Sequence, residues 1–186
     1  THNLSSDLSE NLEYTYSPAS YSIDHQPDDG LRVMGYLRKG GEMGIRNELW
    51  IVPTVGCVNG QAQAIAERLR RECDCSFLDD VRVYTHNYGC SQLGDDHLNT
   101  QRALASLIKH PNAGGVLVLG LGCEENHLEA FRPYLGEIDE ARIRFLNLQD
   151  CRDDEAEGLA ILKELKALTA SDVREPIPLS ELVIGV

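Results

Sequence analysis

Basic residues are scarce in this 186-residue sequence, and no apolar segment is long. Lysine and arginine number 17 against 30 aspartate and glutamate residues, giving a formal net charge of -13. Such a field repels a polyanion, so we expect no nucleic-acid partner. No apolar run approaches the roughly 20 residues that cross a bilayer, and no signal-peptide pattern opens the chain. The sequence therefore predicts no membrane association and a cytoplasmic location.

Several motifs of common enzyme and metal sites are missing. There is no Walker A sequence, no Gly-x-Ser-x-Gly elbow and no Cys-x-x-Cys pair, so phosphate loops, serine hydrolysis and zinc ribbons lack their signatures. The segment Gly120–Glu125 begins like Gly-x-Gly-x-x-Gly, but a glutamate stands at the third glycine, where it would face a pyrophosphate. We therefore expect no nucleotide cofactor. A nucleotide-binding regulator nevertheless stays open as an alternative function, which thermal stabilisation by a nucleotide would reveal.

Six cysteines are present, but their distribution argues against disulfides. They are spread along a chain that is large enough to build its own core, unlike the dense framework of a small secreted domain. We therefore expect free thiols at all six positions, which are Cys57, Cys73, Cys75, Cys90, Cys123 and Cys151.

The two ends of the sequence suggest a domain of a longer chain. Residues 1–30 are rich in Ser, Asp, Asn and Pro, which is typical of a linker. The first residue is Thr1 rather than methionine, and the last five, Leu182–Val186, resemble the start of a buried strand. We expect 1–30 to be a linker from a missing N-terminal domain and 31–186 to be one α/β domain, with a C-terminal domain also missing.

From residue 31 onward, apolar runs alternate with helical patterns. Strands are expected at 49–55, 81–85, 116–119 and 143–146, after a short apolar segment at 31–36 and before a fifth strand at 181–186. Helices are expected around 62–69, 104–108, 128–135 and 159–168, where apolar residues share one stripe. Pro53 has no backbone N–H to donate to a neighbouring strand, so it should lie at a strand end or bulge. This alternation predicts a doubly wound parallel sheet in a three-layer, flavodoxin-like or Rossmann-like α/β domain.

Three turns in this pattern are built alike. Each places a glycine before a cysteine, at Gly56-Cys57, Gly89-Cys90 and Gly122-Cys123, and the cysteines are spaced 33 residues apart. Equal spacing of strand–helix units predicts three thiols on the carboxyl edge of the sheet, where such folds bind ligands. Thiols near helix N-termini are suited to a soft metal, and the helix ends to an anion. The competing interpretation is that each cysteine is a small apolar filler.

Other polar residues accompany these turns. His86 and Asn87 follow the second strand and Glu124 the third, on the same predicted edge, although each is also consistent with a purely structural role. Arg46 and Asn47 precede the first strand and should lie at the opposite edge unless the preceding turn folds over.

Five ordered motifs resemble the second domain of the altronate/galactarate dehydratase family, and sulfolactate dehydratases share the first of them. The resemblance covers roughly residues 33 to 186. It rests on the segments 35–47, 54–59, 86–96, 110–112 and 120–124, which read GYLRKGGEMGIRN, TVGCVN, HNYGCSQLGDD, HPN and GLGCE.

The resemblance implies a hydro-lyase that converts a sugar acid to a 2-keto-3-deoxy acid and requires ferrous iron. It also implies flanking domains, a small β-rich one before this domain and a large one after it. Removing a proton beside a carboxylate needs a stabilised enolate, a base and an acid. We hypothesise that Cys57, Cys90 and Cys123, together with His86, face a site shared with a neighbouring domain, which binds iron, another divalent metal or the substrate carboxylate. The candidate metal ligands are thus Cys57, Cys90 and Cys123; the candidate catalytic residues are His86 and Glu124; and the candidate substrate-binding residues are Arg46, Asn47, Asn59 and Gln92.

Two alternatives stay open. The three thiols resemble the cysteines of cluster-bearing dehydratases, but those enzymes have a different fold, so an iron–sulfur cluster ranks below ferrous iron. The domain is otherwise a non-catalytic scaffold or dimerisation module of the enzyme, with chemistry done by flanking domains. A homodimer in solution would favour that second interpretation.

Overall fold

The computed structural model describes residues 16–20 and 30–185. The predicted linker, residues 1–30, therefore lies largely outside the described part of the chain, apart from residues 16–20 and 30. In the described part, no helix combines the length and the apolar character needed to cross a membrane.

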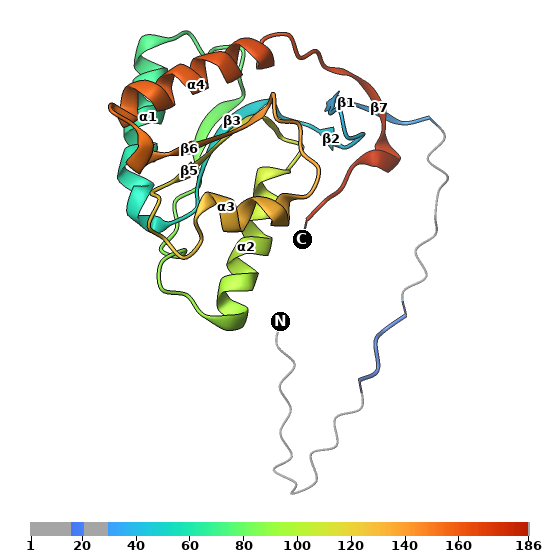
Figure 1. The fold of residues 1–186 in the computed structure, drawn as a ribbon. Helices are drawn as coiled ribbons and strands as arrows, with labels where there is room; N and C mark the ends of the chain where they lie inside the picture. Colours follow the sequence, from blue (N-terminus) through green and yellow to red (C-terminus); the bar gives the residue numbers. More distant parts are fainter. Residues whose placement is uncertain (1–15, 21–29, 186) are drawn as a thin grey trace, which may run out of the picture.

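A four-stranded parallel sheet forms the centre of the molecule (Figure 1). Its order is β4-β3-β5-β6, so in chain order the first strand lies between the second and third, as in flavodoxin-like folds. The predicted α/β fold with a doubly wound parallel sheet is confirmed. Its strands are β3 (Glu48–Pro53), β4 (Asp80–Val83), β5 (Ala113–Gly120) and β6 (Ile143–Asn147); its helices are α1 (Asn59–Glu72), α2 (Gly94–Ile108), α3 (Leu128–Phe131) and α4 (Asp154–Thr169).

Alternate residues of the central strands pack into two separate cores. Leu49 and Ile51 of β3 join the buried face of α1 and α4, whereas Trp50 and Val52 join α2 and α3. Figure 1 shows these two pairs of helices on opposite sides of the sheet. Strands covered on both faces must be apolar throughout, which explains the continuous apolar runs in the sequence.

Local sequence signals account for several element ends. Pro53 is the last residue of β3, as expected of a residue without a backbone donor. The predicted helix at 128–135 divides into α3 and a 3-10 turn at Arg132–Leu135, because Pro133 cannot continue an α-helix. The Asp153 carboxylate caps α4 by accepting from the Ala156 amide at 2.9 Å.

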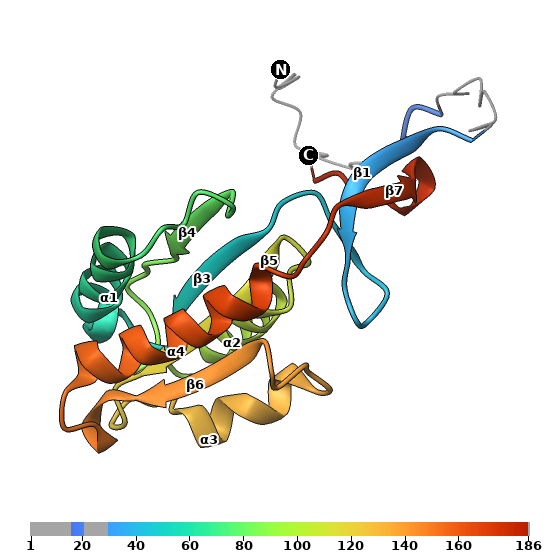
Figure 2. The same cartoon turned by 90° about the horizontal axis from the view of Figure 1, so that it is seen from above.

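A second, antiparallel sheet lies to one side of the first (Figure 2). The position of its last strand differs from the prediction. It has the order β2-β1-β7, formed by β1 (Arg32–Leu37), β2 (Met43–Gly44) and β7 (Glu175–Pro178). The expected fifth strand at 181–186 is wrong: residues 179–181 form a 3-10 turn, and Val183 is 92% exposed. The strand lies earlier because Ile177 is buried against β1, a pairing that two flanking prolines hide in the sequence.

Candidate functional site

The carboxyl edge of the parallel sheet holds the candidate site. Strand order reverses between β3 and β5, so the chain leaves their carboxyl ends toward opposite faces of the sheet. Such switch points are where open α/β sheets bind ligands. All three Gly-Cys turns lie in the loops of this edge.

Backbone hydrogen bonds join the three turns directly. The Gly56 amide donates to the Tyr88 carbonyl at 2.9 Å, and the Asn126 amide donates to the Gly89 carbonyl at 3.2 Å. The structure therefore brings the turns together. The second turn differs from the other two, which follow their strands directly as predicted. It lies within an irregular loop, residues 84–93, that follows β4.

Close packing explains the glycine in two of these turns. A Cβ atom at Gly56 would lie 2.5 Å from the His86 carbonyl oxygen. A Cβ atom at Gly89 would run into the Thr54 carbonyl, and its φ of 96° also favours glycine. These glycines let the loop after β4 lie against the end of β3.

The three cysteines of the turns are exposed rather than packed as apolar filler. The Cys90 Sγ lies 3.7 Å from the Ser91 hydroxyl, and Ser91 has a φ of 56°, which is rare for a residue other than glycine. Among the side chains of residues 16–20 and 30–185, no group of three or more His, Cys, Asp or Glu is placed to hold a metal ion. The thiols suit a soft metal chemically, but the described residues alone do not form such a site.

Glu124 is a buried anchor between two turns. Its Oε1 accepts from the Thr54 hydroxyl at 2.7 Å and the Leu121 amide at 3.1 Å, and its Oε2 accepts from the Gly122 amide at 2.6 Å. Burial raises the pKa of this carboxyl, but the hydrogen bonds from Thr54 and the backbone outweigh that effect and leave the pKa lowered. Glu124 is thus held ionised and joins the carboxyl ends of β3 and β5.

His86 has both ring nitrogens engaged. Nδ1 accepts from the Tyr88 amide at 3.1 Å, so Nε2 carries the proton and donates to the Pro53 carbonyl at 2.8 Å. This is the neutral tautomer. A proton could be accepted only at Nδ1, after the Tyr88 amide has moved away.

Asn59 and Gln92 hold the loop after β4. The Asn59 amide nitrogen donates to the His86 carbonyl at 2.7 Å. Gln92 accepts from the Gly89 amide at 2.9 Å and donates to the Thr100 hydroxyl at 3.0 Å. Both residues predicted to bind substrate thus lie at the expected edge. Gln92 is hydrogen-bonded through both of its amide atoms, whereas the buried Asn59 Oδ1 has no hydrogen-bond partner among the described residues.

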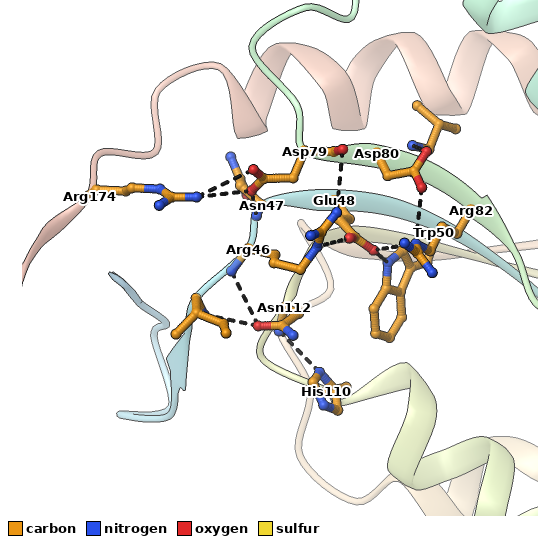
Figure 3. A network of polar contacts seen from close by, with 12 residues as sticks. Arg46, Asn47, Glu48, Trp50, Asp79, Asp80, Arg82, His110, Asn112 and Arg174 are labelled. Carbon is orange, nitrogen blue, oxygen red and sulfur yellow. Dashed lines mark hydrogen bonds and ion pairs between the residues drawn. The ribbon is translucent and has the colours of Figure 1, made fainter. Parts of the chain in front are cut away.

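Arg46 and Asn47 lie at the opposite, amino edge of the sheet (Figure 3). Arg46 pairs with Glu48, and Asn47 donates from its side chain to the Thr169 carbonyl at 3.1 Å. The turn before β3 does not fold over to the Gly-Cys turns. These two residues therefore do not share a site with the cysteines.

Two residues of the candidate site were not singled out from the sequence. Thr54 and Asn126 are fully buried, and the Asn126 side-chain amide donates to the Thr54 carbonyl at 3.1 Å. Both follow strands of the sheet. A polar residue directly after a buried apolar run was the available signal for Thr54.

Fold and site together define a flavodoxin-like α/β domain. The turns at its carboxyl edge are hydrogen-bonded to one another and carry exposed thiols. Residues 35–170 match the second domain of the D-galactarate dehydratase/altronate hydrolase family. The chain belongs to this family.

Curated relatives extend the match over the whole chain. Altronate dehydratase of Bacillus subtilis (strain 168) is 48% identical, and that of Escherichia coli (strain K12) is 47% identical; both alignments cover 100% of this chain and 37% of the relative. Galactarate dehydratase (L-threo-forming) of E. coli is 26% identical over 86% of this chain and 33% of its own length. The chain thus spans about a third of the length of these relatives.

Proposed function

We propose that this domain is part of a hydro-lyase that dehydrates a sugar acid of the altronate or galactarate type to a 2-keto-3-deoxy acid. The observation that carries this proposal is the family match, with near-50% identity to two altronate dehydratases along the whole chain. The ligand-binding edge of the fold supports a place for this domain at the active site.

In this proposal the two candidate catalytic residues divide their roles. Glu124 positions the Gly122-Cys123 turn as a permanent anion, since its lowered pKa makes it a poor proton carrier near neutral pH. His86 transfers a proton through Nδ1, which only one loop amide occupies. The Tyr88 amide must leave Nδ1 for this transfer, while Asn59 and Gln92 hold the loop on either side of it, at the His86 carbonyl and the Gly89 amide.

Ferrous iron belongs to the proposal through the family resemblance and through the thiol donors of Cys57, Cys90 and Cys123. When bound, iron would supply a Lewis acid for the carboxylate beside the reacting carbon. The described residues form no complete set of ligands, so we propose that the thiols contribute to a site shared with a neighbouring domain.

A scaffold or dimerisation role is the second candidate, and one feature favours it. Large apolar side chains are exposed on and beside the small antiparallel sheet, including Met34, Leu37 and Val183. Such residues are typical of a surface covered by another domain or subunit. In that case the chemistry would belong to the flanking domains.

Product analysis tests the proposed activity. A complete enzyme containing this domain, supplied with ferrous iron without oxygen, should release a 2-keto-3-deoxy acid from altronate or galactarate. The keto acid can be measured as its semicarbazone by absorbance. Folded enzyme that leaves both sugar acids unchanged would contradict the dehydratase assignment.

A further inference from the structure

A groove of about 320 Å³ opens at the amino edge of the parallel sheet, away from the Gly-Cys turns. Glu48 and Trp50 of β3 lie beside Arg82 of β4 and Tyr84 just after it, because Trp50 and Arg82 are partners in the parallel register. His110, just after α2, also lines the groove (Figure 3).

A buried carboxylate orients two arginines at this groove. Glu48 is only 2% exposed, and its Oε2 accepts from the Trp50 indole at 2.7 Å and pairs with the Arg82 Nε at 3.1 Å. Its Oε1 pairs with the Arg46 Nε. Both guanidinium groups are therefore held by their inner nitrogens, which fixes their orientation.

The outer nitrogens of these arginines are available. Within the described part of the chain, no hydrogen bond is made by the Arg82 Nη atoms, and the Arg46 Nη2 makes only a 3.5 Å contact with the Asp79 carbonyl. The side chains are 41% exposed for Arg46 and 46% exposed for Arg82. Each guanidinium group presents its outer donors in the planar arrangement that matches a carboxylate.

The nearby acidic groups are largely engaged elsewhere. Asp79 accepts from the Asn47 amide at 2.6 Å and pairs with Arg174. Asp80 accepts from the Val81 amide at 2.7 Å, and its other oxygen shares the Arg82 Nε with Glu48. The outer face of the groove thus offers cationic donors in a chain whose formal net charge is -13.

The rings of Tyr84 and His110 add an apolar surface beside these donors, and both pack on Trp50, which is only 3% exposed. The Trp50 ring lies 4.7 Å from the Tyr84 ring and 5.4 Å from the His110 ring, measured between centroids. Sites for small organic ligands combine such an apolar surface with a few well-placed polar groups.

We propose that this groove binds a small carboxylate, with the carboxyl group on the outer nitrogens of Arg46 and Arg82 and the carbon chain on Tyr84 and His110. This site is separate from the Gly-Cys turns and does not depend on the dehydratase assignment. Its ligand is a free small acid rather than an acidic side chain of another protein.

The only tryptophan of the chain makes the test direct. Succinate is titrated into the 186-residue protein while Trp50 emission and heat are recorded, and neutral succinamide serves as the control ligand. Succinate should give saturable binding in both signals, and succinamide should give none. Arg82→Gln should raise the Kd about tenfold, because a charge-assisted contact is lost.

Arg68→Gln is the matched control variant. Arg68 also pairs with a glutamate, Glu72 at 2.8 Å, but on the outer surface of α1, so its loss should leave the Kd unchanged. Arg82→Lys keeps the charge without the planar fork and should also weaken binding. It serves as the test variant if a thermal melt shows that Arg82→Gln is unfolded. Absence of succinate binding, equal binding of succinamide, or Arg82 variants with unaltered affinity would each overturn the proposal.

Discussion

At the scale of single residues, Glu124 shows how a carboxylate is kept buried and charged. Its sequence position, after an apolar strand and beside Gly122-Cys123, is consistent with a catalytic residue or with a purely structural role. The structure gives its carboxylate three donors, from Thr54, Leu121 and Gly122. The Thr54 donor is distant in the sequence, so sequence alone could not predict this anchoring.

Replacing Glu124 tests this anchoring role. In Glu124→Gln, the amide NH2 must face the Gly122 or Leu121 N–H, which leaves a buried donor without an acceptor. The free energy of unfolding should fall by about 1–3 kcal/mol in urea titrations at neutral pH. Glu125→Gln, at the exposed neighbouring position, should change it by less than about 0.5 kcal/mol. Equal effects of the two variants would rule out the anchor.

The pH dependence of this loss has a definite sign. The folded-state pKa of Glu124 is lowered from its ordinary value of 4.5, so its contribution to stability is complete above that value. It is lost as the pH falls through the lower folded-state pKa. Urea titrations below pH 4.5 should therefore show the wild type and Glu124→Gln converging, whereas a gap that widens in acid would contradict the ionised anchor.

At the scale of elements, the sequence predicted the strands and helices that have strong apolar patterns. The runs within β3 and β5 are buried on both faces, and their composition alone identifies them. β7 was missed because Pro176 and Pro178 lack amide donors and disguise a strand that pairs with β1 only. The turns were placed on the correct edge, but their mutual hydrogen bonds depend on loop conformation, which no local pattern specifies.

The contact between the loop after β4 and the end of β3 can be tested at Gly89. Gly89→Ala would place a Cβ against the Thr54 carbonyl and 2.8 Å from the Val55 Cα. Gly94→Ala has the same kind of positive φ, 59°, but its Cβ would meet nothing within 4 Å. By chemical denaturation, Gly94→Ala should cost about 1 kcal/mol and Gly89→Ala about 2 kcal/mol more. Similar costs for both would show that the loop is not tightly packed there.

At the scale of the whole molecule, an ion-pair cluster ties the loop after β1 to the parallel-sheet domain. Asp172, after α4, pairs with Arg38 at 3.0 Å and with Arg142 at 2.6 Å. Arg38 also donates to the Pro111 carbonyl at 2.7 Å. These partners are distant in the sequence, which is why the association of the two sheets could not be predicted.

Removing the shared carboxylate should weaken the whole fold. In Asp172→Asn, two arginines lose their common anion at a site where Asp172 is only 12% exposed. The free energy of unfolding should drop by about 3 kcal/mol, measured by urea denaturation. Asp139→Asn disrupts a 4.0 Å pair with Lys39, which is 81% exposed, and should cost less than about 0.5 kcal/mol. Comparable stability of the two variants would show that this ion-pair cluster does not hold the loop after β1 to the parallel-sheet domain.

The Gly-Cys turns give this domain its proposed place in the dehydratase active site. The most direct measurement is kcat for sugar-acid dehydration by a complete enzyme containing this domain, with Cys57, Cys90 or Cys123 changed to Ser. Cys73→Ser, at a partly buried position on the end of α1, is the control. We predict that each turn variant loses at least about tenfold in kcat while the control retains it. If the turn variants are as active as Cys73→Ser, the Gly-Cys turns are not part of the active site, and the scaffold role of this domain is favoured.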